Sequence, residues 1–235
     1  MSPTSDDRTV VRRAWATLRP DGADVAVLTV AAVLYLLITA DVVAGGLMTR
    51  LDEVVRDATL PSGDPPAWTE VVGLLGNLGA MGGAALVVTI VVMQLTWRWW
   101  PGVFAAAELA VTGLVVSTTK YLVDRPSPTG ESPDGHLGFF PSGHTATAVI
   151  GMGTIVFLVS LRADRPHAPR PGPRPALVAG VLAGALVASS SVFSGHHWLS
   201  DVLASLVVCA AILIVGCNAV ERHLEVGKVA RKAAA

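Results

Sequence analysis

The chain has 235 residues, of which 52% are hydrophobic and only 15% are charged. This composition excludes a soluble globular domain of that length, which needs more polar surface to cover its core. The formal net charge of −1 provides no overall basic field of the kind that binds nucleic acid, so no nucleic-acid partner is expected. Cys209 and Cys217 lie about two helical turns apart in one apolar run, and this spacing argues against a disulfide.

Six apolar segments are long enough to cross a bilayer as helices, because a hydrocarbon core of ~30 Å needs roughly 20 residues. The sequence therefore predicts an all-α, polytopic membrane protein with six transmembrane helices. Its membrane domain covers residues 25–220, between an N-terminal segment (1–24) and a basic tail (221–235). The predicted spans are Val25–Met48, Leu74–Trp97, Val103–Val123, His144–Leu161, Ala176–Phe193 and Trp198–Asn218.

The segment between the first two spans is acidic and then rich in proline. It predicts a short interfacial helix over Asp52–Leu60, followed by a turn. Two carboxylates, Asp41 and Glu108, fall inside predicted spans. Intramembrane carboxylates can mark a proton or ion path, but we favour interhelical hydrogen bonds for both.

The distribution of Lys and Arg predicts the orientation, because cytoplasmic segments carry an excess of both. With both termini inside, four basic residues lie outside: Arg50, Arg56, Lys120 and Arg125. The other thirteen lie inside: Arg8, Arg12, Arg13, Arg19, Arg98, Arg162, Arg165, Arg170, Arg174, Arg222, Lys228, Arg231 and Lys232.

Three polar clusters interrupt the apolar sequence, over Lys120–Pro126, Phe140–Thr145 and Ser190–Asp201. They follow the third span, begin the fourth, and join the fifth to the sixth. The predicted topology brings all three to the outer face. Ionisable groups near a bilayer are costly and usually functional.

Four side chains in these clusters suggest nucleophilic chemistry. His197 and Asp201 are four residues apart and therefore share a helix face. The carboxylate can bind one imidazole nitrogen and leave the other as nucleophile or base. His144 can then protonate a leaving oxygen, and Lys120 can supply positive charge to the transferring group.

The sequence Pro141-Ser142-Gly143-His144 opens the fourth span. Helix N-termini attract phosphate through unpaired N–H groups and the helix dipole. Gly143 allows the backbone to approach an anion closely. This segment therefore predicts an anion-binding helix start.

Together these clusters resemble the PAP2 superfamily of type 2 phosphatidic acid phosphatases, whose fold is shared with vanadium haloperoxidases. The resemblance covers roughly residues 75–220. It implies that His197 attacks phosphorus to form a phosphohistidine, oriented by Asp201, and that His144 serves as acid and base. It also implies that Lys120, Ser142 and the Gly143 amide hold the phosphoryl oxygens. The superfamily needs no metal or other cofactor, and none is expected.

The sequence departs from the family pattern at two positions. In register with Lys120 and His197, the two family arginines fall on Ser127 and Ser191. Both serines and Arg125, two residues before Ser127, are therefore candidate substrate-binding residues. A charge-assisted hydrogen bond contributes about 1.5–3 kcal/mol. The loss of two such bonds is expected to weaken the binding of phosphate.

We expect a membrane phosphatase that hydrolyses a lipid phosphate or diphosphate, of phosphatidate or polyprenyl type, at the outer face of a plasma membrane. Two alternatives stay open. One is a lipid phosphotransferase that acts on a phosphodiester head group, and the other is a non-catalytic protein of the same fold that binds or transports. The expected partner is the lipid substrate, and a homo-oligomer is compatible with the sequence.

Overall fold

The computed structural model describes residues 20–60, 64–130, 138–162 and 172–233. Within these ranges, six helices are long and apolar enough to cross a membrane, which confirms the predicted all-α, six-span architecture. Most of the predicted N-terminal segment, residues 1–19, lies outside the described residues. The spanning helices are α2 (Gly22–Ala44), α5 (Gly83–Thr96, extended to Leu78 by the short helix η2, Leu78–Gly82), α6 (Trp100–Val123), α7 (Gly143–Arg162), α8 (Arg174–Phe193) and α9 (Leu199–Ala233).

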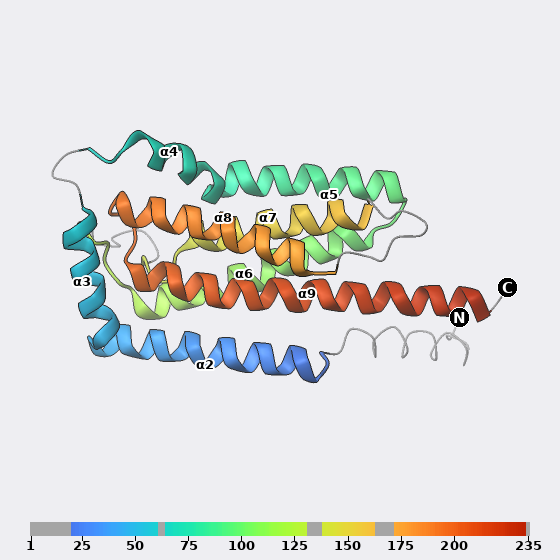
Figure 1. The fold of residues 1–235 in the computed structure, drawn as a ribbon, viewed down its shortest axis with the longest axis horizontal. Helices are drawn as coiled ribbons and strands as arrows, with labels where there is room; N and C mark the ends of the chain where they lie inside the picture. Colours follow the sequence, from blue (N-terminus) through green and yellow to red (C-terminus); the bar gives the residue numbers. More distant parts are fainter. Residues whose placement is uncertain (1–19, 61–63, 131–137, 163–171, 234–235) are drawn as a thin grey trace.

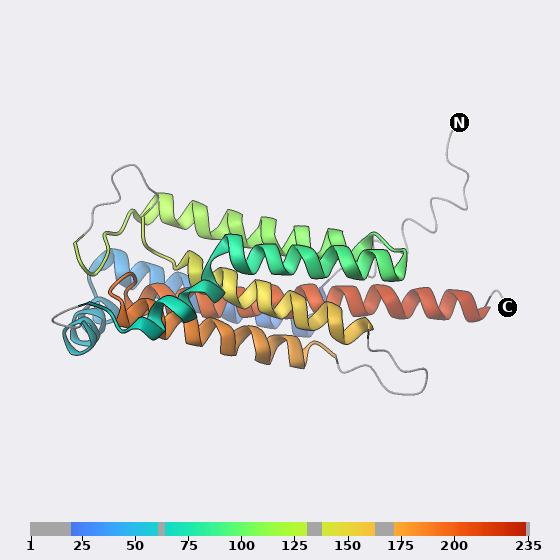
Figure 2. The ribbon, with the colours of Figure 1, turned by 90° about the horizontal axis from the view of Figure 1, so that it is seen from above.

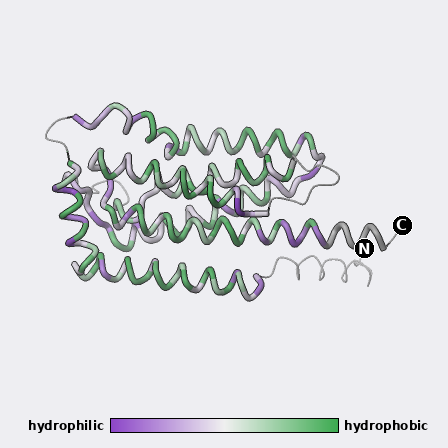
Figure 3. Tube along the Cα trace, in the orientation of Figure 1, coloured by the Kyte–Doolittle hydropathy of each residue, from purple (hydrophilic) through white to green (hydrophobic). Residues whose placement is uncertain are grey.

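The long helices run alongside one another as an elongated bundle (Figures 1 and 2). One shorter helix, α3 (Leu47–Thr59), lies across the end of the bundle that is opposite to the C-terminus (Figure 1). We call this end the α3 end; here α3 contacts the start of α9, α6 ends and α7 begins. Hydrophobic residues dominate the long helices, while hydrophilic residues gather at the α3 end and in the part of α9 just before its grey end (Figure 3).

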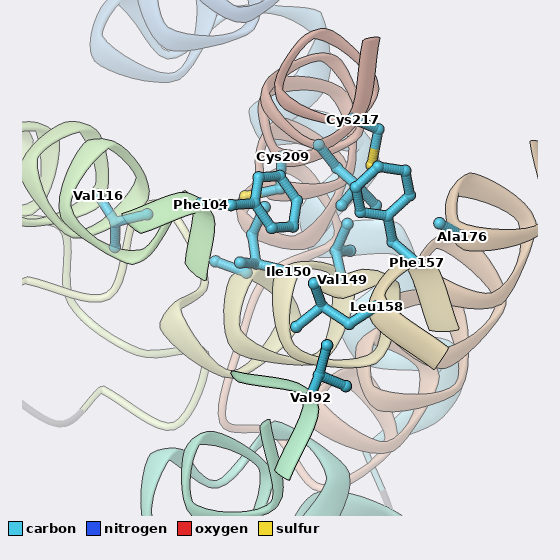
Figure 4. Close-up of a cluster of buried hydrophobic side chains, with 12 residues drawn as sticks. Val92, Phe104, Val116, Val149, Ile150, Phe157, Leu158, Ala176, Cys209 and Cys217 are labelled. Atoms are coloured by element: carbon cyan, nitrogen blue, oxygen red, sulfur yellow. The ribbon is translucent and has the colours of Figure 1, made fainter. Parts of the chain in front are cut away.

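The core lies between α6, α7 and α9 (Figure 4). Phe104 of α6 and Phe157 of α7 are in contact there, with ring centroids 5.1 Å apart. Cys209 and Cys217 are buried free thiols, in agreement with the prediction that they form no disulfide. Helices α7 and α8 approach closely at Gly180, where a Cβ atom would lie 2.6 Å from the Val149 carbonyl oxygen. Small residues allow this backbone contact between membrane helices.

The first span ends at Ala44, so the predicted end at Met48 is wrong. Gly45 adopts a left-handed conformation with φ 66° and terminates α2. The carboxylate of Asp41 then accepts hydrogen bonds from the backbone N–H groups of Leu47 and Met48, at 3.0 and 2.7 Å. This pairing confirms an interhelical hydrogen bond for Asp41, and it starts α3 five residues before the predicted Asp52.

The second span is also shorter than predicted, because Leu74–Trp97 is not one helix. A short helix, α4 (Ala67–Gly73), lies between the predicted turn and the predicted start of the span, and a 3₁₀ turn, η1 (Leu74–Gly76), occupies that start. Asn77 then caps the spanning helix, since its side-chain oxygen accepts hydrogen bonds from the N–H groups of Gly79 and Ala80. The span begins only after this cap.

The last helix, α9, continues to Ala233, well past the predicted end of the span at Asn218. The polar residues that suggested an end instead bind α2. Asn218 donates a hydrogen bond to Asp24 at 2.8 Å, and Arg222 forms an ion pair with Asp24 at 2.6 Å. Because these polar groups have partners, the helix can continue through them. The predicted domain boundaries near residues 24 and 220 therefore fall inside α2 and α9.

Candidate active site

The three polar clusters predicted to share one face meet at the α3 end. The first lies where α6 ends, the second where α7 begins, and the third where α8 turns into α9. Backbone contacts join them. The Ser142 N–H donates to the Asp201 carbonyl at 3.1 Å, and the Phe139 N–H donates to the Arg125 carbonyl at 2.9 Å.

His197 and Asp201 form the predicted pair at the start of α9. His197 Nδ1 lies 3.1 Å from Asp201 Oδ2, and both residues are buried. The same oxygen accepts a hydrogen bond from the Trp198 N–H at 3.0 Å, which caps the first turn of α9. With Nδ1 bound to the carboxylate, Nε2 is the ring nitrogen that can act as a nucleophile.

The other oxygen of Asp201 is held by Arg125. Its guanidinium donates to Asp201 Oδ1 at 2.8 Å, to Ser200 Oγ at 2.7 Å and to Asp52 Oδ2 at 2.7 Å. Both carboxylates are buried, and a buried charge needs such a partner. Arg125 therefore connects α3 to α9 and fixes the carboxylate that orients His197. This arrangement favours a positioning role for Arg125; direct contact with substrate stays a prediction.

Asp52 of α3 completes this connection from the other side. It accepts hydrogen bonds from the Ser200 backbone N–H at 2.8 Å and from the Ser200 hydroxyl at 2.5 Å. A side chain from a distant helix thus satisfies an N–H group in the first turn of α9, which has no partner within the helix. The sequence analysis missed both Asp52 and Ser200. Only the spacing of Asp52 and Arg56, which share one face of a short amphipathic helix, hinted at a role.

His144 lies on the first turn of α7, with its ring centroid 6.3 Å from that of His197. It is solvent-exposed, whereas His197 is buried. The 3₁₀ turn η1 packs behind it, because a Cβ atom on Gly76 would lie 2.8 Å from His144 Cβ. Glycine at this position therefore leaves the space that the backbone of His144 occupies.

Ser142 is fully buried and caps α7, since its Oγ accepts a hydrogen bond from the Thr145 N–H at 3.2 Å. Its carbonyl accepts a further bond from Ser205 Oγ of α9 at 2.8 Å. The hydroxyl proton of Ser142 is not used in this cap and can still be donated to an anion. Gly143 follows at the helix start, as predicted.

Lys120 lies in the last turn of α6, where its ammonium donates to the Gly138 carbonyl at 2.6 Å. The side chain runs beside the start of α7, because a Cβ atom on Gly143 would lie 3.9 Å from Lys120 Cε. The predicted cation and the predicted anion-binding helix start are therefore neighbours.

The two serines at the predicted arginine positions are both buried. Ser127 Oγ lies 2.9 Å from Thr129 Oγ1 in the loop after α6. Ser191 acts through its backbone, since its carbonyl accepts from the N–H groups of His196 and His197 and closes the turn before α9. Whether either hydroxyl contacts substrate stays a prediction.

Glu108 in α6 does not follow its prediction. It is buried, but its Oε2 has no hydrogen-bond partner among the described residues, so the expected interhelical bond is not made there. Gly216 of α9 provides its space, since a Cβ atom at that position would collide with the carboxylate. Glu108 lies twelve residues from Lys120 along α6, about 18 Å at 1.5 Å per residue, and takes no part in the site.

Chemically, the cluster combines an oriented imidazole, a second imidazole across a gap, a lysine and a helix start. These groups suit attack on phosphorus followed by protonation of a leaving oxygen. Over the described residues, no group of three or more His, Cys, Asp or Glu side chains is placed to hold a metal ion.

Comparisons with known proteins agree with this arrangement. No curated protein matches the sequence. A crystal structure described as the first transmembrane PAP2 type phosphatidylglycerolphosphate phosphatase from Bacillus subtilis has a similar fold, with a TM-score of 0.66 and 18% sequence identity. The match covers 80% of this chain and 92% of that chain. The sequence profile of the PAP2 superfamily matches residues 101–224, more than half of the chain and all three clusters. The protein therefore belongs to the PAP2 superfamily and is a multi-pass membrane protein.

Proposed function

We propose that this protein is a PAP2-type phosphatase that hydrolyses a lipid phosphate or diphosphate through a phosphohistidine. The proposal is carried by the pairing of His197 with Asp201, with His144 6.3 Å away across the gap. This distance joins the two ring centroids, so the second imidazole lies close enough to reach an oxygen of a phosphoryl group bound at His197.

The reaction has two steps. In the first, the lone pair of His197 Nε2 attacks phosphorus, and the bond from phosphorus to the lipid oxygen breaks. Protonated His144 gives its proton to that oxygen. In the second, neutral His144 takes a proton from water, the water oxygen attacks phosphorus, and the bond from phosphorus to His197 Nε2 breaks. Phosphate leaves, and both histidines return to their starting states.

A lipid substrate is supported by a groove of about 400 Å³ between α5, α6 and α7. Its lining is almost entirely apolar and includes Gly143, beside His144, and Thr154 further along α7. Eleven residues of helix separate these two positions, about 16 Å. An acyl or prenyl chain lying in this groove would hold its phosphate next to His144. The fold neighbour is named for the phosphatase activity on phosphatidylglycerolphosphate, which is also a lipid phosphomonoester.

We further propose that the site faces the outside of the plasma membrane. The positive-inside rule supports this orientation. Labelling of single cysteines with an impermeant thiol reagent tests it. A cysteine at position 130, beside the site, should react in intact cells, and one at position 230 only after lysis. The reverse pattern would overturn the orientation but leave the chemistry untouched.

A lipid phosphotransferase remains a second candidate because of Ser127 and Ser191. A phosphomonoester carries nearly two negative charges and a phosphodiester carries one, so a site with fewer cations is better suited to a diester. In that reaction, an acceptor alcohol would replace water in the second step.

One assay separates these activities. Purified protein is incubated with phosphatidate, a polyprenyl diphosphate and a phosphodiester lipid, and both released phosphate and new lipid products are measured. Phosphate release that is absent in His197→Ala supports the hydrolase. A new phospholipid formed from the diester supports the transferase. If the folded protein forms neither product, only the non-catalytic alternative remains.

A further inference from the structure

The predicted phosphate site has few free cations for an anionic substrate. Ser127 and Ser191 stand where the register predicts arginines, and the Arg125 guanidinium binds the carboxylates of Asp52 and Asp201. Lys120 is the predicted cation that remains beside the helix start. Beside Lys120, protonated His144 and the start of α7, a guanidinium would add a further fixed positive charge for a phosphoryl group bound next to His197.

Helix α3 brings one more guanidinium to this place. Asp52 anchors α3 to the start of α9 and to Arg125, as described above. Arg56 is four residues after Asp52 and therefore lies on the same face of α3, one turn further along. Its guanidinium lies over the Trp198 ring, 5.5 Å from the centroid, and Trp198 is the residue that follows His197.

Arg56 and His197 line the same small cavity. The cavity also contacts Pro128 and Val192, which are the chain neighbours of Ser127 and Ser191. Arg56 therefore approaches His197 from the side where the two predicted arginine positions lie. Its position on α3 places it outside the region that matches the family profile, residues 101–224.

The Arg56 guanidinium is available to a ligand. Its ion-pair partner is the adjacent Asp57, at 2.8 Å, and the two side chains are 34% and 69% exposed. Exposed pairs of this kind contribute little to stability, so a phosphoryl group can replace Asp57 as partner at small cost. The cavity itself is only about 10 Å³, so the side chain must rotate as the phosphoryl group enters.

We propose that Arg56 is a substrate-binding residue that grips the phosphoryl group at His197, in place of the arginines missing at Ser127 and Ser191. A guanidinium can bind two phosphoryl oxygens at once, which a lysine cannot do. This inference rests on the proposed function and assigns part of its phosphate site to α3.

The test compares Arg56→Ala with Arg50→Ala. Arg50 lies on the same helix, is exposed, and is six residues earlier, about 240° around the helix axis at 100° per residue. Arg56→Lys is the third variant; it keeps the positive charge but lacks the guanidinium that can bind two phosphoryl oxygens at once. The readouts are KM and kcat for the lipid phosphate that the wild type hydrolyses, and the affinity for inorganic phosphate by calorimetry, which requires no turnover.

We expect Arg56→Ala to raise KM and weaken phosphate binding roughly ten- to hundredfold, the range for one charge-assisted contact. Arg56→Lys should recover only part of the loss, and Arg50→Ala should stay within about twofold of wild type. All three should keep the wild-type melting temperature in detergent. Equal phosphate affinity in Arg56→Ala and Arg50→Ala would overturn the role of Arg56. Phosphate binding that depends on Arg56 in a protein that hydrolyses no lipid would contradict the hydrolase proposal alone.

Discussion

Asp201 and Glu108 are both buried carboxylates in this protein, but their surroundings differ. Both oxygens of Asp201 have partners, from His197, the Trp198 N–H and Arg125. Glu108 lies among apolar side chains in the interior of the bundle, and its Oε2 has no partner among the described residues. Two threonines near this level, Thr112 and Thr154, also have a hydroxyl without a partner there.

The difference shows where this fold fixes polar groups and where it only accommodates them. At the α3 end, Asp52 connects α3 to α9, and Asp201 binds His197, Trp198 and Arg125, so each of these two carboxylates is held by several bonds at once. Around Glu108, space is available because Gly216 has no side chain, and among the described residues no hydrogen bond reaches Oε2 of the carboxyl group. Precise chemistry requires the first situation. We therefore expect mutations at the two places to have very different effects on turnover.

The largest effect is expected for His197→Ala, which should lower turnover by at least ~10³-fold because no other group is aligned to accept the phosphoryl group. Phosphate release from the preferred lipid measures this effect. His196→Ala is the control, since His196 is exposed and its Nδ1 bonds to Ser194 within the turn. If His196 proves essential and His197 dispensable, the assignment of the nucleophile is wrong by one residue.

The next effect is expected for Asp52→Ala, which contacts no substrate. Without Asp52, Arg125 loses one carboxylate and the Ser200 N–H at the start of α9 loses its partner, so we expect Asp201 and His197 to shift. Misplacement by about 1 Å can cost 10²-fold in rate, so we expect kcat to fall roughly 10- to 100-fold with a smaller change in KM. Glu53→Ala, at an exposed position on the same helix, is the control. Equal activity in both variants would show that α3 does not position the site.

A smaller effect, in the opposite direction, is expected when Ser127 and Ser191 are both replaced by Arg. If the two serines simply replace the family arginines in a phosphatase, the double variant should bind a phosphomonoester about tenfold more tightly, since it gains guanidinium contacts. The assay compares KM for phosphatidate and for a phosphodiester lipid. Lower activity on the diester lipid, without tighter binding of the monoester, would instead favour the transferase. Lower activity on both lipids, in a variant shown to be folded, would count against both the phosphatase and the transferase.

The smallest effect is expected for Glu108→Gln, which preserves the volume of the side chain and removes its capacity to ionise. Activity should stay within about twofold of wild type, because Glu108 is remote from the reacting groups. The kcat/KM for lipid phosphate tests this. A fall in kcat/KM of more than tenfold would show that Glu108 matters for turnover and would support a proton or ion path through α6.

Sequence reasoning could predict the groups whose partners are close in the chain. The four-residue spacing of His197 and Asp201 predicted their pairing, although His197 lies in the turn before α9 and not on the helix. The sequence Pro141–His144 also predicted the start of a helix, which the structure places at Gly143. Six apolar runs also sufficed for the number of spans. These features depend on helix periodicity and bilayer thickness, which local sequence records.

The wrong or missing predictions concern features that tertiary contacts determine. Hydropathy measures only apolar length, so it ended the last helix at Asn218, although Asn218 and Arg222 find a partner in Asp24 of α2. The same approach recognised an interfacial helix near Asp52 but could not assign it a role. Asp52 contacts Ser200, which is 148 residues away along the chain, and no local pattern predicts that contact.

The cap that Asp52 places on α9 also limits how far the site can be reduced. The region that carries the family signature, residues 101–224, contains both histidines, Asp201 and Lys120. It lacks the carboxylate that satisfies the start of α9 and the helix that presents Arg56. A fragment cut at the edge of the signature would contain the reacting groups without their support. We therefore expect the smallest unit that keeps this site intact to begin before α3, because this helix supports the site and is not only an appended anchor.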